Sequence, residues 1–209
     1  MESASKIAQL LLQIKAIKLN AKTPFTWASG IQSPIYCDNR IALSHPYVRN
    51  EIKKAFIHDA SYFPPFDAIA GVATAGIPHG AILADALGLP FIYVRSKAKG
   101  HGRQNLIEGD LPDESRVLVV EDLISTGGSS MEAIEALKKA TFQIIGLVAI
   151  FTYQLDFASE KFEQNDILVR TLTDYTKLIS VAQELKYIDS QDLDLLASWR
   201  KAPGSWQPN

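Results

Sequence analysis

The sequence predicts an α/β protein whose central, mostly parallel sheet is flanked by helices. Short and almost wholly apolar runs alternate with stretches of helical periodicity after residue 67, which is typical of a parallel sheet covered on both faces. The chain has 209 residues, 47% of them hydrophobic and 21% charged, as expected of a globular domain with a sizeable core. It has no internal repeat and no long linker, so we expect one domain over residues 1–209.

The amino-terminal part of the chain predicts two helices separated by short strands. Apolar residues recur at helical spacing from Ile7 to Ile17, which indicates an amphipathic helix. Prolines and a glycine between residues 23 and 43 favour turns between short strands. A second helix is expected to begin at residues 44–46, because proline suits the first turn of a helix.

The rest of the chain predicts the sheet and its covering helices. The apolar runs predict strands over 67–72, 91–94, 117–120, 144–151 and 167–172. Helices are expected over 77–87, 129–140, 175–185 and 190–200. Gly88 is placed to end the first of these helices, and the alternation fits right-handed crossovers between parallel strands.

The charge balance and the single cysteine exclude several classes of protein. Lys and Arg total 21 against 23 Asp and Glu, so no overall positive field attracts nucleic acid. The apolar runs are too short to span a bilayer, and no signal peptide is recognisable. Cys37 has no second cysteine to pair with, which suits a reducing compartment. We expect a cytoplasmic protein without nucleic-acid or membrane partners.

Residues 95–113 form a long polar segment between two predicted strands. Four basic side chains fall within seven residues of it: Arg95, Lys97, Lys99 and His101. Gly100 and Gly102 give this stretch conformational freedom, and loops of such length in compact domains usually have a function. The pattern predicts that residues 95–102, here called the basic loop, close over a polyanion. The alternative interpretation is that the loop is an ordinary solvated loop with basic side chains.

The most informative segment is the apolar run 117–120 with the residues that follow it. The run ends in Glu121 and Asp122 and continues into a Gly-rich turn over 125–129 before a helix. Ligands of open parallel sheets bind at the carboxyl ends of the strands, and such a turn offers N–H groups, hydroxyls and a helix dipole to a phosphate. Because adjacent carboxylates repel an anion, they should face hydroxyls or a cation. A ribose 5-phosphate suits both parts of the segment, because its hydroxyls can face the carboxylates and its phosphate can face the turn. The alternative interpretation is a solvated strand end followed by an ordinary turn.

Other phosphate motifs fit this sequence poorly. A G-x-G-x-x-G pattern is absent, and the glycines at 71 and 76 have Walker-type spacing but are followed by Ile77 where that motif needs lysine. His45, His58 and His79 are expected at the surface or at helix ends, since none has a metal-ligand partner at suitable spacing. Cys37 is expected to be a buried and inert thiol.

The acidic strand end and its turn resemble the 5-phosphoribosyl 1-diphosphate (PRPP) signature of type I phosphoribosyltransferases. The resemblance covers nearly the whole chain and is to the branch that uses orotate. Three further stretches carry it: residues 25–38 resemble the segment that covers the base, residues 71–78 the loop on the pyrophosphate side, and residues 95–102 the mobile catalytic loop.

The resemblance implies the type I phosphoribosyltransferase fold, with a small hood mainly from about residues 1–45 and a core over about 66–172. It also implies transfer of the 5-phosphoribosyl group from PRPP to orotate, which releases pyrophosphate and supplies pyrimidine nucleotide synthesis. Mg²⁺ is the implied cofactor, with few protein ligands of its own. The implied assembly is a homodimer whose active sites are shared between subunits.

The resemblance also assigns roles to individual residues. To PRPP binding it assigns Arg95, Lys99, His101, Glu121, Asp122, Leu123, Ile124, Ser125, Thr126, Gly127, Gly128 and Ser129. Lys99, His101, Arg95 and Asp122 are the expected catalytic residues, with His101 a proton donor to pyrophosphate. Ser125 is expected to contact orotate, and no residue is expected to be a dedicated metal ligand.

The chain departs from the better-known orotate enzymes at three positions. Ala75 and Ser96 stand where many members have lysine, and Tyr153 stands where others have an arginine for the orotate carboxylate. The carboxylate is therefore expected to rest on Ser125 and backbone groups of the amino-terminal segment. Lys18 is a further candidate for the site, as the counterpart of an amino-terminal lysine of the family.

Two other functions compete with this interpretation. A purine phosphoribosyltransferase would share the PRPP loop but not the basic loop or the segment at 25–38. A PRPP-sensing regulator would keep the fold without catalysis, but the chain has no spare segment for a nucleic-acid-binding domain.

Overall fold

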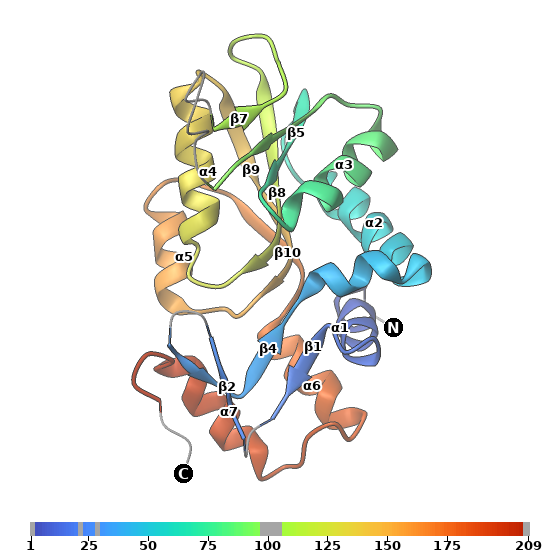
Figure 1. Ribbon diagram of the computed structural model, residues 1–209, viewed down its shortest axis with the longest axis vertical. Helices are drawn as coiled ribbons and strands as arrows, with labels where there is room; N and C mark the ends of the chain where they lie inside the picture. Colours follow the sequence, from blue (N-terminus) through green and yellow to red (C-terminus); the bar gives the residue numbers. More distant parts are fainter. Residues whose placement is uncertain (1–2, 21–22, 28–29, 97–105, 207–209) are drawn as a thin grey trace.

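The computed structural model describes residues 3–20, 23–27, 30–96 and 106–206. Its main sheet has six strands in the order β10-β9-β8-β5-β6-β7 (Figure 1). Their bounds are β5 Ala68–Val72, β6 Phe91–Val94, β7 Ile107–Glu108, β8 Arg116–Ile124, β9 Gln143–Thr152 and β10 Val169–Asp174. Neighbouring strands are parallel except for the antiparallel pair of β6 and β7 at one edge. The predicted α/β fold with a mostly parallel sheet is confirmed.

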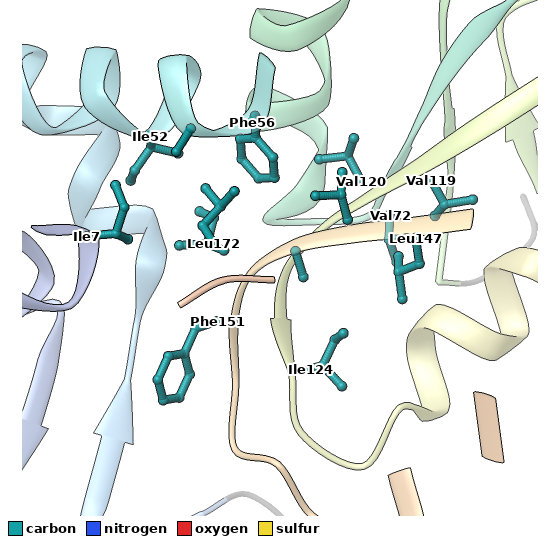
Figure 2. Packing of buried hydrophobic residues seen from close by; sticks show 14 of the residues in the cluster. Ile7, Ile52, Phe56, Val72, Val119, Val120, Ile124, Leu147, Phe151 and Leu172 are labelled. Atoms are coloured by element: carbon teal, nitrogen blue, oxygen red, sulfur yellow. The ribbon is translucent and has the colours of Figure 1, made fainter. Parts of the chain in front are cut away.

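Helices cover both faces of this sheet. Figure 1 shows α2 (Pro46–Ala60) and α3 (Gly76–Leu87) on one side, and α4 (Gly128–Lys139) and α5 (Asp156–Glu163) on the other. The central strands are apolar because both faces are covered, and the four valine and leucine residues of 117–120 are fully buried. Figure 2 shows Ile52 and Phe56 of α2 gathered with Ile7 around Leu172 of β10.

The amino-terminal segment forms two small antiparallel sheets at one end of the molecule. β1 (Ile17–Leu19) pairs with β4 (Ile35–Cys37), and β2 (Phe25–Thr26) pairs with β3 (Gln32–Ser33). The other elements at this end are α1 (Ser3–Gln13), the 3₁₀ helix η1 (Asn39–Ser44), α6 (Tyr175–Glu184) and α7 (Asp192–Lys201). Figure 1 places β2 beside α7, so the first and last parts of the chain meet there.

Several element boundaries differ from the prediction for identifiable reasons. The first helix ends at Gln13 rather than continuing to Ile17, because Lys15 adopts a left-handed φ of 57° and Ile17 joins β1. β8 runs through the two acidic residues to Ile124, because β9 pairs with it as far as Thr152. β7 and α5 were not expected, since β7 has two residues and α5, which begins at Asp156, has Leu155 at its N-cap position and therefore no side-chain cap.

An ion pair fixes the amino-terminal end of β8. Arg116 donates from its backbone N–H and from Nε to Oδ2 of Asp67, both at 3.0 Å, and from Nη2 to Oδ1 at 2.7 Å. These bonds lower the pKa of Asp67 from 3.8 to about 2. Within the described residues, no helix is long and apolar enough to cross a membrane.

The Asp67 carboxylate should stabilise the fold in a pH-dependent way. Its folded-state pKa is depressed, so its contribution should be complete above pH 3.8 and lost as the pH falls toward about 2. Asp67→Asn should therefore unfold at a lower denaturant concentration than the wild type near neutral pH. This gap between the two denaturation midpoints should narrow in acid. Urea titrations at a series of pH values measure this gap. A gap that does not change with pH would contradict the assignment.

Candidate active site

Two adjacent cavities lie at the carboxyl ends of the central strands. The first, here called the acidic cavity, has a volume of about 310 Å³ and is lined by Cys37, Asp38, Arg40, Ala73, Thr74, Ala75, Glu121, Asp122, Leu123 and Ser129. The second, the aromatic cavity, measures about 500 Å³ and is lined by Thr26, Trp27, Tyr36, Cys37, Leu123, Ser125, Thr126 and Tyr153. Because Cys37 and Leu123 line both, the two cavities adjoin each other.

Two adjacent carboxylates of β8 dominate the acidic cavity. Glu121 is 6% exposed, and its Oε1 accepts the backbone N–H of Asp122 at 3.0 Å, while Ser130 Oγ donates to Oε2 at 3.4 Å. Burial, together with the charge of Asp122, raises the pKa of Glu121 well above its usual value. Burial also raises the pKa of Asp122. Groups so placed are stabilised by a ligand that donates hydrogen bonds or carries positive charge.

The amino-terminal segment is tied directly to this carboxylate strand. Asn39 is fully buried, and its Nδ2 donates to the main-chain oxygen of Asp122 at 2.7 Å. Its Oδ1 accepts from Cys37 Sγ at 3.3 Å. Asn39 therefore fixes Cys37, which lines both cavities, relative to Asp122.

The Gly-rich turn follows β8 as the sequence predicts. Gly127 adopts a left-handed φ of 71°, and α4 begins at the next residue. A Cβ at Gly127 would also lie 3.1 Å from the ring of Phe162, so glycine is required there on two grounds. The turn leads into the amino-terminus of α4, where backbone N–H groups and the helix dipole favour an anion.

The structure distributes the turn residues between the two cavities. Ser125 and Thr126 line the aromatic cavity, and Ser129 lines the acidic cavity. Leu123 lines both, whereas Ile124 is buried and its side chain lies in the core (Figure 2). Alternate residues of a strand face opposite sides, so Ile124 can take part only through its backbone.

The loop before α3 forms the opposite wall of the acidic cavity. Ala73, Thr74 and Ala75 line the cavity, and the peptide between Ala73 and Thr74 is cis. A Cβ at Gly76 would lie 2.5 Å from the carbonyl oxygen of Val120. Only glycine therefore lets this loop and the start of α3 approach the carboxylate strand so closely.

Of the four basic side chains of the basic loop, Arg95 is the one that lies within the described residues. It follows β6, its backbone N–H donates to Leu106 O at 2.8 Å, and its Nη1 lies 3.4 Å from Glu108 Oε1. It lines a small pocket of about 60 Å³ together with Ala73 and Ser129, which also line the acidic cavity. Lys97, Lys99 and His101 lie outside the described residues.

An aromatic cluster that the motifs did not reveal forms the wall of the aromatic cavity. The rings of Trp27 and Tyr153 are 4.9 Å apart, and Trp199 of α7 packs against both, at 5.6 and 5.7 Å. Trp27 Nε1 donates to Ile35 O, and Trp199 Nε1 donates to Gln32 O. Tyr153 is 2% exposed, and burial raises its pKa well above 10. This buried tyrosine cannot supply the positive charge of the arginine that other members have at the same position.

His79 lies in the first turn of α3, at a helix end as expected, but its side chain is 2% exposed and therefore does not lie at the surface. α2 and α3 lie side by side on one face of the sheet and contact each other (Figure 1), and Phe56 of α2 packs 6.2 Å from the His79 ring. Burial lowers the pKa of His79 to about 4, so it is neutral near pH 7. His45 and His58 are exposed as predicted. Cys37 is partly buried, and burial raises the pKa of its thiol.

The fold and the order of its motifs place the protein in a known class. The family model described as "Phosphoribosyl transferase domain" matches residues 46–185, which is 140 of the 209 residues. The class is therefore that of the phosphoribosyltransferases.

Comparison with individual proteins identifies the branch. The orotate phosphoribosyltransferase of Enterococcus faecalis is 50% identical over 204 residues, 97% of this chain and 97% of the relative. The solved orotate phosphoribosyltransferase of Aeropyrum pernix superposes with a TM-score of 0.76 at 26% identity, over 88% of this chain and 99% of that one. The chain belongs to the orotate phosphoribosyltransferase family.

One longer protein shares the fold. The UMP synthase of Leishmania donovani superposes with a TM-score of 0.82 at 24% identity. The match covers 98% of this chain but 43% of that longer chain. At this identity the likeness concerns the fold alone.

Gly76→Ala should disrupt the acidic cavity. The new Cβ would overlap a backbone oxygen that cannot rotate away, so the loop at 73–75 must shift, at a cost of about 1 to 3 kcal/mol. Gly204→Ala is the matched control, because nothing lies within 4 Å of its Cβ. Denaturant unfolding of both variants measures the difference. Equal stability of the two variants would contradict the close approach of α3 to β8.

Proposed function

We propose that this protein transfers the 5-phosphoribosyl group of PRPP to orotate, which yields orotidine 5′-phosphate and pyrophosphate. The proposal rests above all on the full-length relative with 50% identity that bears the name of this activity. The site supports it, because a cavity lined by carboxylates adjoins one lined by aromatic rings. A sugar and a planar base can thus bind side by side.

The ribose and its phosphate would occupy the end of β8. We assign Glu121 and Asp122 to the ribose hydroxyls, which can donate hydrogen bonds to these carboxylates. As the bond from the anomeric carbon to pyrophosphate breaks, positive charge develops on the ring, and the two acidic groups lie where they can stabilise it. The 5′-phosphate is assigned to residues 125–129, at the start of α4.

Pyrophosphate would leave toward the loop at 73–75 and the basic loop. Arg95 lines the pocket that adjoins the acidic cavity at Ala73 and Ser129. Lys99 and His101 are assigned to the departing group on the resemblance alone, with His101 as the proton donor. Positive charge there matters most in the transition state, when negative charge gathers on the leaving group.

Orotate would bind in the aromatic cavity. Trp27 and Tyr36, which are partly exposed, provide ring surface for a flat base, Tyr153 packs against Trp27, and Ser125 lines the same cavity. We assign the orotate carboxylate to Ser125 and to backbone N–H groups near Tyr36 and Cys37. A ring nitrogen of orotate then attacks the anomeric carbon from the face opposite to pyrophosphate, with inversion.

The donor set suits Mg²⁺ that is held mainly by its ligand. Asp38, Glu121 and Asp122 line the acidic cavity, and carboxylate oxygens are ligands that Mg²⁺ prefers. Among the described residues, however, no group of three or more His, Cys, Asp or Glu side chains is arranged to hold a metal. We propose that Asp122 and Glu121 face Mg²⁺ carried by PRPP, which would offset the charge of the diphosphate.

The remaining proposals concern the oligomeric state, the cellular location and the domain organisation. We propose a homodimer in which the basic loop of each subunit enters the site of the other, in a cytoplasmic enzyme of pyrimidine nucleotide synthesis. We also propose that hood (about 1–45) and core (about 66–172) act as one phosphoribosyltransferase domain. One hydrophobic cluster that joins α1, the sheet and α7 supports this unity.

The choice of base tests the function. With PRPP and Mg²⁺, the protein should consume orotate, followed by its ultraviolet absorbance, and should not consume adenine, hypoxanthine or uracil. Consumption of a purine instead would favour a purine phosphoribosyltransferase. Binding of PRPP without consumption of any base would favour a PRPP-sensing regulator.

Mixing of two inactive variants tests the shared site. Lys99→Ala should lower turnover by orders of magnitude while PRPP still binds, and Asp122→Asn should be inactive for a different reason. If loops are exchanged, dimers refolded from both variants should contain one intact site and recover part of the wild-type rate. Activity no greater than the sum of the separate variants would contradict sharing.

A further inference from the structure

Arg40 is a residue of the acidic cavity that neither the motifs nor the resemblance singled out. Three carboxylates line this cavity, those of Asp38, Glu121 and Asp122. Among the described residues that line it, Arg40 is the one with a positive charge. A ligand with several phosphate groups gains from a cation on this otherwise negative surface.

The guanidinium of Arg40 is held in place but remains open to a ligand. Its Nε lies 2.7 Å from Asp38 Oδ1 and its Nη2 lies 2.9 Å from Asp38 Oδ2, and Asp38 Oδ1 also accepts the backbone N–H of Arg40 at 3.2 Å. Asp38 thus engages two of the five N–H groups that a guanidinium carries. The side chain is 62% exposed. The contact with Asp38 also fixes the direction of the other N–H groups of the guanidinium. N–H groups fixed in this way can bind a phosphate by hydrogen bonds, even though Asp38 balances the charge of Arg40.

The position of Arg40 suits the diphosphate rather than the 5′-phosphate. It lies in η1 directly after Asn39, which is bonded to the main chain of Asp122. It lines the acidic cavity together with the loop at 73–75. Of the turn assigned to the 5′-phosphate, Ser125 and Thr126 line the aromatic cavity and Ser129 lines the acidic cavity.

We propose that Arg40 binds the diphosphate of PRPP, and the pyrophosphate product, by hydrogen bonds from the guanidinium edge that Asp38 leaves open. The proposal rests on the proposed function, because it takes PRPP as the ligand. It adds a binding residue from the amino-terminal segment, so that the diphosphate contacts this segment as well as the core.

The experiment compares Arg40→Gln, Arg40→Lys and a matched control. Arg116→Gln removes an arginine that makes the same paired contact with an aspartate, Asp67, at the opposite end of β8. Calorimetry with Mg²⁺ measures the affinity of each variant for pyrophosphate and for ribose 5-phosphate, and steady-state kinetics give KM for PRPP and orotate.

Arg40→Gln should weaken pyrophosphate binding and raise KM for PRPP by about tenfold, the loss expected for one charge-assisted hydrogen bond. Affinity for ribose 5-phosphate and KM for orotate should change less than about twofold, and Arg40→Lys should recover part of the loss. Arg116→Gln should leave all four quantities unchanged.

Two results would overturn the proposal. One is pyrophosphate affinity in Arg40→Gln equal to that of Arg116→Gln, and the other is an equal loss for pyrophosphate and ribose 5-phosphate, which would indicate a general structural role. Failure of the wild type to consume orotate would instead contradict the proposed function. The pyrophosphate titrations would still decide the role of Arg40 in that case.

Discussion

The burial of two adjacent carboxylates at the end of the central strand is the constraint on which the rest of the site depends. Glu121 and Asp122 both have raised pKa values, because burial disfavours their charged forms. A carboxyl group with a raised folded-state pKa costs stability as the pH rises from its unfolded value toward its folded value. The cost is smaller when a bound ligand donates hydrogen bonds to the pair. A ligand that donates hydrogen bonds to the two carboxylates therefore stabilises the site.

Contacts between distant parts of the chain hold this arrangement. Asn39 reaches the main chain of Asp122 across 83 residues of sequence, and Trp199 reaches Gln32 across 167. Gly76 lets the start of α3 approach β8 from the other side. The amino-terminal segment and the strand β8 line both cavities, and Trp199 of the last helix packs behind Trp27 and Tyr153 of the aromatic cavity. A change in any of these parts should alter the shape of the two cavities.

Local sequence patterns predicted the framework but not these long-range contacts. The apolar runs located the parallel strands, because strands buried on both faces must be apolar, and the residues from Glu121 to Ser129 predicted the candidate site. The role of Trp199 has no local signal, since it depends on packing against Trp27 and Tyr153. Burial of His79 follows from the packing of α2 against the side of α3, which periodicity does not specify. Arg40 lines the cavity only because η1 is fixed to β8.

A crystal structure of the protein with ribose 5-phosphate would test the central claim most directly. The account predicts the phosphate at the turn of residues 125–129 and the ribose hydroxyls within hydrogen-bond distance of Glu121 and Asp122. A sugar phosphate bound elsewhere, with both carboxylates free of contact to it, would contradict the account.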